Sequence, residues 1–299
     1  MKAVTRVTLL NEQGEKFFGE GPARLLREVE RHGSLRAAAI SMEMAYTKAL
    51  KLTKQAEAAL GYPLITRTTG GRDGGGSILT PEGKRWLQTY EAYRDACIRS
   101  NQTLYRKFFP RTGCVIMASG LGRRFGSNKL MADFHGAPMI QRALDATKGL
   151  FSQVVVVTRH EAVADLCRAQ GICVVFHDLP HRSDTVRLGL EALGDMDCCM
   201  FLPGDQPLLR RETVEMLLEK WKEAQDMILR PIYEDSEGSP VLFPSWAFPE
   251  LLDLPEGKGG GVVINNHTQA VCRVSVADPF ELADADTPET LEFLVHLSK

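Results

Sequence analysis

The 299-residue sequence predicts an α/β fold with a mostly parallel sheet, preceded by a smaller domain of helices and one β-hairpin. After Pro110, short apolar segments alternate with helical segments, which is typical of a parallel sheet covered on both faces. Before Pro110 the order is helix, helix, helix, hairpin, helix. We therefore expect two domains, residues 1–109 and residues 110–299.

The distribution of charge supports this division. Residues 1–110 contain 18 Lys and Arg against 11 Asp and Glu, a net charge of +7, whereas residues 111–299 contain 18 against 27, a net charge of −9. A basic first domain is compatible with a polyanionic partner such as nucleic acid. Ordinary variation between solvated surfaces is the alternative explanation.

The composition excludes several classes of protein. The chain is 44% hydrophobic and 25% charged, as in globular proteins that bury a core. No apolar run approaches the roughly 18–20 residues needed to cross a bilayer, and the first residues lack the apolar centre of a signal peptide. The seven cysteines are scattered without a CxxC pair, which argues against a disulfide framework or structural zinc. We therefore expect a cytoplasmic protein.

The first domain begins with an extended segment and continues as helices. Pro22 suits the start of the first helix, Gly33 ends that helix, and Ser34 can cap the next one. The expected elements are an extended segment over the first 20 residues, helices near 22–32, 37–39 and 45–60, a hairpin over 62–79 and a helix over 80–104. Five glycines between residues 70 and 76 mark the loop of the hairpin.

The helix over 45–60 has two distinct faces. Its expected packing face consists of Ala45, Ala49, Leu52 and Ala56, and its outward face of Thr47, Lys48, Lys51 and Lys54. Hydroxyl and ammonium groups on an outward face suit the major groove of DNA. In the hairpin, Arg67, Thr68, Thr69 and Arg72 are candidates for contacts with phosphates or a minor groove. The alternative is a small docking domain with a solvated lysine face.

Four segments of this domain carry a family resemblance. They are GSLRAAA at 33–39, MAYTKA at 44–49, GGRDGGG at 70–76 and LTPEG at 79–83. Together they resemble the N-terminal domain of ModE-type molybdate-responsive regulators. The resemblance implies a winged helix-turn-helix that binds DNA as a homodimer. The molybdate-binding module of that family is not visible, and a different domain follows.

In the second domain, a glycine-rich loop directly follows the first strand. We expect strands at 114–117, 154–157, 172–176 and 199–202, and helices at 138–148, 161–170, 185–193 and 211–224. Gly120, Gly122 and Gly126 allow backbone N–H groups to approach phosphate oxygens. Arg124 and Lys129 add positive charge for a triphosphate or a departing pyrophosphate. The loop matches neither the Walker pattern nor GxGxxG.

The loop pattern G-x-G-x-R-x-G-x-x-K resembles the signature of MobA/MocA-like nucleotidyltransferases of the molybdenum cofactor group. Further matches occur in the family's order: LPGDQPL at 202–208, GSPVLF at 238–243 and DADTPE at 284–289. The resemblance implies a Rossmann-like nucleotidyltransferase domain that uses Mg²⁺. GSPVLF resembles the cytidylyltransferase branch, which implies CTP and the molybdenum cofactor (molybdopterin) as substrates and a molybdenum hydroxylase as a possible client.

The resemblance and the chemistry of the side chains together assign roles. Arg124, Lys129 and Asp205 are the expected catalytic residues, and Asp205 with Asp286 the expected Mg²⁺ ligands, because Mg²⁺ prefers hard oxygen ligands. The expected nucleotide-binding residues are Ala118, Ser119, Gly120, Gly122, Gly126 and Thr185. Alternative roles are structural: Asp205 as a solvated loop residue, Asp286 or Thr287 as a helix cap, and Thr185 or Ser183 as the cap of another helix.

Other side chains point less clearly to function. His135, His177, His181 and His267 lack HxxxH or HxE spacing and are expected to be surface or hydrogen-bonding residues. Cys198 and Cys199 are expected to pack in a buried strand.

The expected reaction is transfer of CMP from CTP to the phosphate of the molybdopterin cofactor, with release of pyrophosphate. The small residue at position 119 resembles the cytidine-using pattern of the family more than the guanosine-using one, whereas GKGGG at 257–261 has a lysine where the family often has an acidic residue. Three alternatives remain open. GTP is the donor, the acceptor is a sugar phosphate or methylerythritol phosphate, or the chain is a transcription regulator that senses nucleotide or cofactor without turnover.

Overall fold

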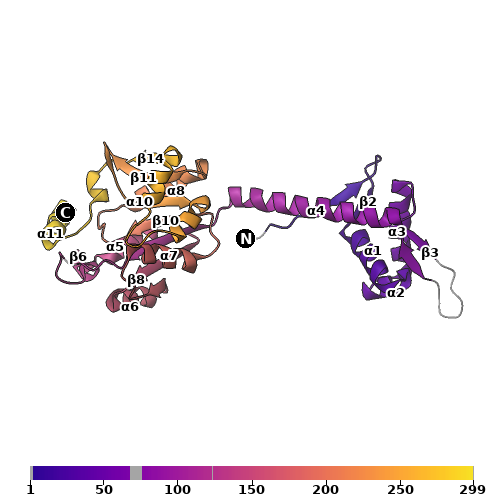
Figure 1. The fold of residues 1–299 in the computed structure, drawn as a ribbon, viewed down its shortest axis with the longest axis horizontal. Coiled ribbons are helices and arrows are strands. Elements are labelled where there is room, and N and C mark those ends of the chain that lie inside the picture. The colour runs from indigo at the N-terminus through magenta and orange to yellow at the C-terminus, as the bar shows by residue number, and fades with distance from the viewer. Residues whose placement is uncertain (1–2, 68–75, 123, 299) are drawn as a thin grey trace. The chain divides into compact units, whose positions relative to one another are not determined.

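The computed structural model describes residues 3–67, 76–122 and 124–298, and the chain divides into two compact units, Met1–Phe108 and Phe109–Lys299 (Figure 1). Each unit has its own buried apolar core. No helix in the described part of the chain is long and apolar enough to cross a membrane.

The first unit consists of two small hairpins and four helices. Its elements are β1 (Thr8–Leu10), β2 (Lys16–Gly19), α1 (Glu20–His32), α2 (Leu35–Ser41), α3 (Tyr46–Leu60), β3 (Ile65–Arg67), β4 (Ser77–Leu79) and α4 (Pro81–Phe108). The strands pair antiparallel as β1 with β2 and β3 with β4. The predicted order of three helices, a hairpin and a helix is confirmed.

Local signals explain where these helices begin and end. Gly33 ends α1 in the left-handed conformation, with φ of 64°, and the Ser34 hydroxyl accepts the N–H of Ala37 at the start of α2. Thr80 accepts the Gly83 N–H at the start of α4 in the same way, at 2.9 Å. The roles of Gly33 and Ser34 confirm the predictions of the sequence analysis.

The N-terminal segment differs from the expectation of one extended piece. The side chain of Asn11 accepts hydrogen bonds from the N–H groups of Gln13 and Glu15 and closes a turn between β1 and β2. The chain therefore forms a hairpin here, and α1 begins at Glu20 rather than at Pro22.

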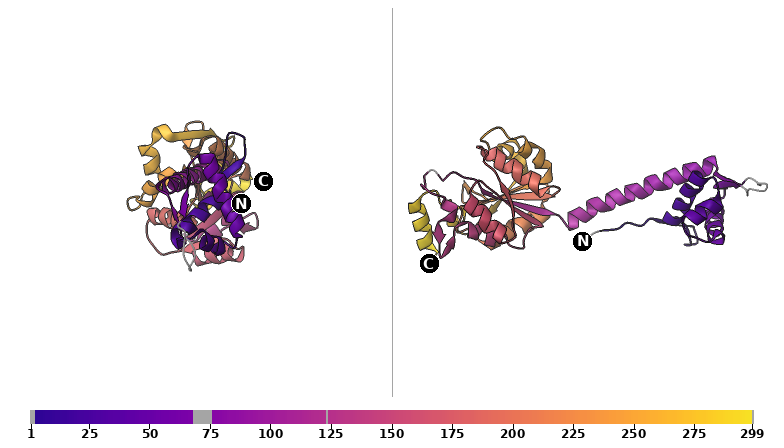
Figure 2. Two further views of the ribbon diagram at one scale, coloured as in Figure 1. Left: turned by 90° about the vertical axis from the view of Figure 1, so that its right-hand side faces the viewer. Right: turned by 90° about the horizontal axis from the view of Figure 1, so that it is seen from below.

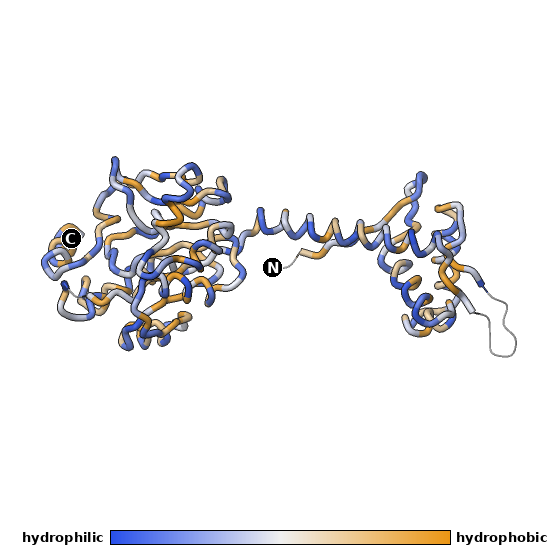
Figure 3. Tube along the Cα trace, in the orientation of Figure 1, coloured by the Kyte–Doolittle hydropathy of each residue, from blue (hydrophilic) through white to orange (hydrophobic). Residues whose placement is uncertain are grey.

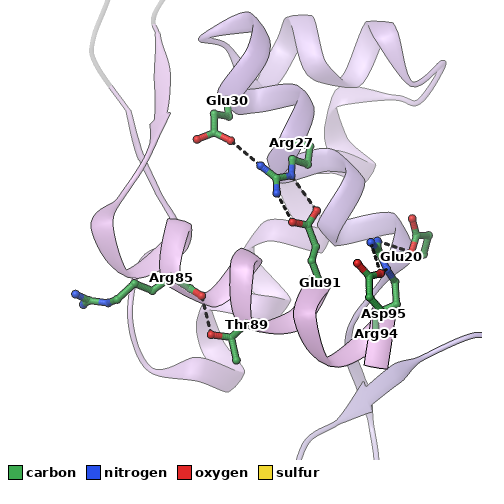
Figure 4. Close-up of polar contacts among 8 residues, drawn as sticks. All are labelled: Glu20, Arg27, Glu30, Arg85, Thr89, Glu91, Arg94 and Asp95. Carbon is green, nitrogen blue, oxygen red and sulfur yellow. Dashed lines mark hydrogen bonds and ion pairs between the residues drawn. The ribbon is translucent and has the colours of Figure 1, made fainter. Parts of the chain in front are cut away.

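Ion pairs link α4 to α1 (Figure 4). Arg27 on α1 donates to both carboxylate oxygens of Glu91, one of them at 2.8 Å, and Arg94 on α4 contacts Glu20 at 3.3 Å. Half-exposed pairs of this kind contribute little to stability. The aromatic core beneath them, where Phe18 lies 4.9 Å from Tyr90 between ring centroids, contributes more.

The second unit is built on an eight-stranded sheet with the order β12-β11-β13-β10-β5-β8-β9, and β14 also pairs with β11. The strands are β5 (Thr112–Ala118), β8 (Gln153–Thr158), β9 (Cys173–Phe176), β10 (Cys198–Pro203), β11 (Ile228–Tyr233), β12 (Ser236–Glu237), β13 (Val241–Pro244) and β14 (Val271–Ser275). The strands β10, β5, β8 and β9 are mutually parallel, and β13 runs antiparallel to β10. The predicted α/β class with a mostly parallel sheet is confirmed.

Helices cover both faces of this sheet, as Figure 2 shows. The helices are α5 (Ile140–Thr147), α6 (Glu161–Ala169), α7 (Arg182–Leu193), α8 (Arg211–Glu223), α9 (Phe248–Leu252), α10 (Gly261–Asn266) and α11 (Pro288–Leu297). Short elements connect them: a small hairpin of β6 (Asp133–Phe134) and β7 (Ala137–Pro138), and the 3₁₀ turns η1 (Lys129–Met131), η2 (Ser245–Ala247), η3 (Thr268–Ala270) and η4 (Pro279–Leu282). The central strands are mostly apolar, as the hydropathy colours indicate (Figure 3).

Alternation along the central strands separates two cores. Cys114 and Ile116 of β5 pack in one core with α5, α6, α8 and α11, and Val115 packs in the other with α7, α9 and α10. Cys198 and Cys199 likewise point into opposite cores, so their predicted packing role is confirmed. At Gly189 an added Cβ would lie 2.6 Å from Val115, so this glycine lets α7 approach β5 closely.

The caps of two helices test the alternative structural roles. His181 is the N-cap of α7 and forms a reciprocal capping box with Asp184, so the expectation that Thr185 or Ser183 caps this helix is wrong. Both residues already lie inside the first turn, where Thr185 is buried. Thr287, rather than Asp286, caps α11 by accepting the N–H of Thr290.

Candidate functional site

A pocket of about 560 Å³ lies in the second unit, beside the carboxyl ends of β5 and β10. In open parallel sheets the loops after the strands gather at this edge and form ligand sites. The lining residues predicted from the sequence are Ser119, Gly120, Gly122, Arg124, Lys129, Thr185, Asp205 and Asp286. Lining residues without a predicted role include Arg159, Leu179, Pro180 and Arg182. His181, Ser239 and Asp284 also line the pocket, although the sequence analysis did not predict that they would.

At one end of the pocket, a buried ammonium group joins two carboxylates. Lys129 Nζ lies 2.5 Å from an oxygen of Asp205 and 2.9 Å from an oxygen of Asp286, and the lysine side chain is only 10% exposed. Arg124 approaches the other oxygen of Asp286 at 2.6 Å. The three predicted catalytic residues and the second predicted metal ligand thus form one contiguous cluster.

The ionisation of this cluster follows from its contacts. Burial acts to lower the pKa of Lys129, but the hydrogen bonds and charges of Asp205 and Asp286 outweigh it, and the pKa lies above its ordinary value. The hydrogen bond from Lys129 lowers the pKa of Asp286, against a smaller opposing effect of burial. The contact between Lys129 and Asp286 therefore favours the charged form of both side chains.

Asp284 is an additional acidic residue of the pocket. Its side chain accepts a hydrogen bond from Gln206 Nε2 at 3.0 Å, and the same amide nitrogen donates to the Leu282 carbonyl. Burial, followed by the negative charge of Asp205, raises the pKa of Asp284 above its ordinary value. The sequence places Asp284 in a family motif, but its contact with Gln206 and the influence of Asp205 on it appear only in the fold.

The loop after β5 wraps around the pocket edge. Gly122 has φ of +57°, and an added Cβ there would lie 2.8 Å from the carbonyl oxygen of Ser127, so only glycine fits this turn. Two predicted nucleotide-binding residues do not line the pocket. Ala118 is buried at the end of β5, where its carbonyl accepts the Thr158 hydroxyl, and Gly126 forms the turn that follows Gly122.

The donor set fits a divalent cation that binds together with a phosphate. Within residues 3–67, 76–122 and 124–298, no three His, Cys, Asp or Glu side chains form a complete metal-binding group. Asp205 and Asp286 nevertheless meet at one cationic atom, Lys129 Nζ. Mg²⁺ in phosphate-transferring sites commonly uses one or two carboxylates and completes its shell with water and substrate oxygens. Two adjacent carboxylates satisfy that requirement.

A hydrogen-bonded histidine contacts two residues that line the pocket, Ser119 and Leu179. His177 is 8% exposed, and its Nε2 lies 2.8 Å from the hydroxyl oxygen of Ser119. Its Nδ1 accepts the N–H of Leu179 at 3.1 Å. The expectation of a hydrogen-bonding role for His177 is confirmed, whereas its position beside the pocket was missed. No sequence motif marks it, because the contact depends on β5 and β9 both flanking β8.

In the first unit, α3 presents the predicted outward face to solvent. Thr47, Lys48, Lys51 and Lys54 are all exposed, and so is Arg67 on β3. Ala49 and Ala56 are buried and Leu52 is half-buried, but Ala45 is exposed because it lies outside the helix as its N-cap. The expectation that Ala45 packs inward is wrong. Thr68, Thr69 and Arg72 lie outside the described residues.

Comparison with known proteins agrees with this geometry. Residues 114–271, which contain the glycine loop, Lys129 and Asp205, match the model of the MobA-like NTP transferase domain. The chain belongs to the MobA-like NTP transferase family. Residues 23–84 match the model of the bacterial regulatory helix-turn-helix protein of the LysR family, so a helix-turn-helix domain precedes the MobA-like transferase domain.

Curated relatives of the MobA-like domain differ in the nucleotide that their names specify. A probable molybdenum cofactor guanylyltransferase from Aquifex aeolicus is 29% identical over 37% of this chain and 54% of its own length. A 3-deoxy-manno-octulosonate cytidylyltransferase from Francisella tularensis is 30% identical over 36% of this chain and 45% of its own length. The chain thus spans about half the length of the curated relatives it matches.

Solved structures share the fold of the MobA-like domain. A crystal structure of a protein from Mycobacterium tuberculosis aligns with a TM-score of 0.55 and 22% identity over 62% of this chain and 98% of that one. A nucleotidyl transferase from Methanothermobacter aligns with a TM-score of 0.53 and 20% identity over 63% of this chain and 98% of that one. Both likenesses concern the fold.

Proposed function

We propose that the pocket transfers CMP from CTP to the phosphate of the molybdopterin cofactor and releases pyrophosphate, with Mg²⁺ as the metal. The observation that carries the proposal is the cluster of Lys129, Asp205 and Asp286 beside the glycine loop. An oxygen of the acceptor phosphate attacks the α-phosphorus and forms a new P–O bond. The bond between that phosphorus and the bridging oxygen breaks, and pyrophosphate leaves with the electron pair.

Each group of the pocket then has a physical task. The backbone around Gly120 and Gly122 lies against the phosphates, and Arg124 and Lys129 neutralise the charge that moves onto pyrophosphate. Asp205 and Asp286 are the proposed Mg²⁺ ligands, and the bound ion would supply additional charge stabilisation. Transfer of this kind depends on positioning and charge rather than on a covalent enzyme intermediate.

The choice of CTP rests on two features of the pocket. Ser119 is a small residue at the start of the loop, and Ser239, from the segment that resembles the cytidylyltransferase branch, also lines the pocket. The relatives include a protein named for guanylyl transfer and another named for cytidylyl transfer. GTP as donor and another phosphorylated acceptor are therefore the competing assignments within this reaction class.

For the helix-turn-helix domain, we propose a ModE-type winged helix that binds DNA as a homodimer. The exposed lysines of α3 and exposed Arg67 support this role, because cations on an accessible helix neutralise DNA phosphates. Arg72 is included in the proposed DNA-binding set on its sequence position alone. A molybdenum hydroxylase is the proposed client for the product.

The exposed lysines of α3 also suit a second candidate function, a DNA-binding regulator whose transferase-like domain senses nucleotide or cofactor without turnover.

A substrate panel tests these assignments. Pyrophosphate release is measured with Mg²⁺ and molybdenum cofactor for CTP, GTP, ATP and UTP in turn, with the acceptor omitted as control. Release that requires the cofactor and is fastest with CTP supports the proposal. Fastest release with GTP overturns the cytidine assignment. Binding of nucleotide without turnover favours the sensing regulator.

A further inference from the structure

The pocket has two chemically different parts. The ammonium group of Lys129 and the carboxylates of Asp205 and Asp286 lie together, which suits phosphates and a metal. Another part of the lining comes from the segment after β9, where Leu179 and Pro180 contribute apolar surface next to His181 and Arg182. Ligand sites commonly combine apolar walls with a few directed polar groups. If the phosphates occupy the charged part, the Leu179–Pro180 wall is left for the nucleobase.

His177 links this wall to the start of the glycine loop. Its Nδ1 accepts the Leu179 N–H, so the proton of the neutral ring must be on Nε2. The Nε2–H therefore donates to the Ser119 oxygen at 2.8 Å, while the Ser119 hydroxyl donates to the carbonyl of Val157 at 3.0 Å. Each hydrogen bond in this chain of contacts therefore has a defined donor and a defined acceptor. The imidazole thus holds Ser119, at the start of the glycine loop, and Leu179, in the segment after β9, at a fixed separation.

Neighbouring groups favour the neutral ring. Burial and then the positive charge of Arg159 lower the pKa of His177, against smaller opposing effects of Asp184 and Asp178. Arg159 also donates to the carbonyl of Leu179, so both backbone polar groups of Leu179 are held. A wall residue fixed at both its N–H and its carbonyl presents a defined surface to a ligand.

We propose that His177 is a positioning residue for nucleotide binding, which fixes the Leu179–Pro180 wall against Ser119 and thereby shapes the part of the pocket that receives the nucleobase. The inference rests on the proposed nucleotidyltransferase function. His177 acts through the two pocket residues it joins, Ser119 and Leu179.

Two variants separate its two hydrogen bonds. In His177→Asn the side-chain oxygen stands near the position of Nδ1 and can accept from Leu179, but the side chain is too short to reach Ser119. In His177→Gln the amide nitrogen stands near the position of Nε2 and can donate to Ser119, but no acceptor faces Leu179. His267→Gln serves as the matched control, because its ring contacts Glu250 on the surface of the same unit.

Calorimetric titration with CTP, GTP and inorganic tripolyphosphate provides the readout. Both His177 variants should weaken binding of the preferred nucleotide on the order of fivefold, as expected for loss of one net hydrogen bond. Tripolyphosphate, which lacks a base, should bind the wild type and all variants alike. The His267 variant should match the wild type with every ligand.

The outcomes distinguish failure of the inference from failure of the proposed function. Unchanged nucleotide affinity in both His177 variants, or an equal loss for tripolyphosphate, overturns the positioning role alone. A wild type that binds neither nucleotide overturns the proposed function and the inference with it. The tautomer has its own measurement, since ¹⁵N NMR of the ring should show a bare Nδ1 and a protonated Nε2, and the reverse pattern contradicts the assignment.

Discussion

In the transferase unit the lysine of the pocket is buried between carboxylates, whereas the lysines on α3 of the helix-turn-helix unit are exposed. Lys129 is 10% exposed and contacts Asp205 and Asp286. For Lys48, Lys51 and Lys54, the described residues supply no carboxylate partner, and each side chain points to solvent. The same side chain is thus used in two physical settings within one chain.

The difference matches what each proposed ligand requires. Phosphoryl chemistry needs a charge held in place before the reaction, because a fixed group pays no reorganisation cost in the transition state. DNA phosphates form an extended polyanion, and exposed mobile cations neutralise it by displacing counterions. The ion pairs of Lys129 therefore indicate a preorganised site, and the unpaired exposed lysines indicate an electrostatic surface.

The largest expected effect is on turnover in Lys129→Met. Loss of the ammonium removes the cation that Asp205 and Asp286 share, leaves Arg124 as the cation at Asp286, and removes charge stabilisation from the departing pyrophosphate. We expect kcat/KM for pyrophosphate release to fall about 10³-fold, or about 4 kcal/mol. Lys148→Met, at an exposed position of the same unit, should retain wild-type turnover. Equal activity of the two variants would remove the distinction between the two kinds of lysine.

The next largest effect is on the stability of the helix-turn-helix unit. A Cβ at Gly83 would collide with the carbonyl oxygen of Leu64. Because the other atoms nearest to that Cβ are also backbone atoms of Leu64, no side-chain movement can relieve the clash. Gly83→Ala should therefore lower the free energy of unfolding of this unit by about 3 kcal/mol. Circular dichroism during thermal unfolding measures the loss. Gly21→Ala on α1 meets no atom within 4 Å and should be neutral or slightly stabilising; similar stabilities for both variants would contradict the packing described.

A smaller effect concerns DNA affinity. Lys51→Gln and Lys54→Gln each remove one exposed cation from α3. Each should weaken binding to duplex DNA about tenfold at low salt and reduce the slope of log affinity against log salt by about 0.9. Fluorescence anisotropy over a salt series measures both quantities, with Lys16→Gln on β2 as control. A slope that does not change would show that α3 lies away from the DNA.

The smallest effect is a pH dependence from His177. Because the folded-state pKa lies below the ordinary value, the unfolded chain binds more protons between the two values. Stability should therefore rise with pH across that window and level off above the ordinary pKa of about 6.5. Chemical denaturation of the wild type and of His177→Asn from pH 5 to 8 measures the difference. A wild type that gains stability on acidification relative to the variant would contradict the buried neutral ring.

The sequence predicted the charged part of the pocket better than its walls. Lys129, Asp205 and Asp286 lie in segments that follow or adjoin strands of one sheet, and the shared edge of that sheet brings such segments together. His177 and Arg159 lie in connections without a motif, and their contacts depend on which strands are neighbours. The exposed face of α3 followed directly from helical periodicity, whereas the exposure of Ala45 depended on the helix starting one residue later.

The two hairpins of the first unit illustrate the same limit. The glycine-rich segment of the sequence predicted the hairpin of β3 and β4. The turn between β1 and β2 depends on the side chain of Asn11 capping two N–H groups, which is a local contact with a weaker sequence signal. Periodicity and the glycine cluster therefore predicted the order of the helices and of the β3–β4 hairpin, whereas the β1–β2 hairpin depends on side-chain capping by Asn11.

Pyrophosphate release by the wild type and by Asp205→Asn tests the central claim most directly. The assay contains Mg²⁺, molybdenum cofactor and the preferred nucleotide, and Asp253→Asn on an exposed helix end is the matched control. The wild type and the control should release pyrophosphate at the same rate, and Asp205→Asn should be slower by at least about 10²-fold. Equal rates in all three proteins, or nucleotide binding by the wild type without any release, would contradict a catalytic pocket.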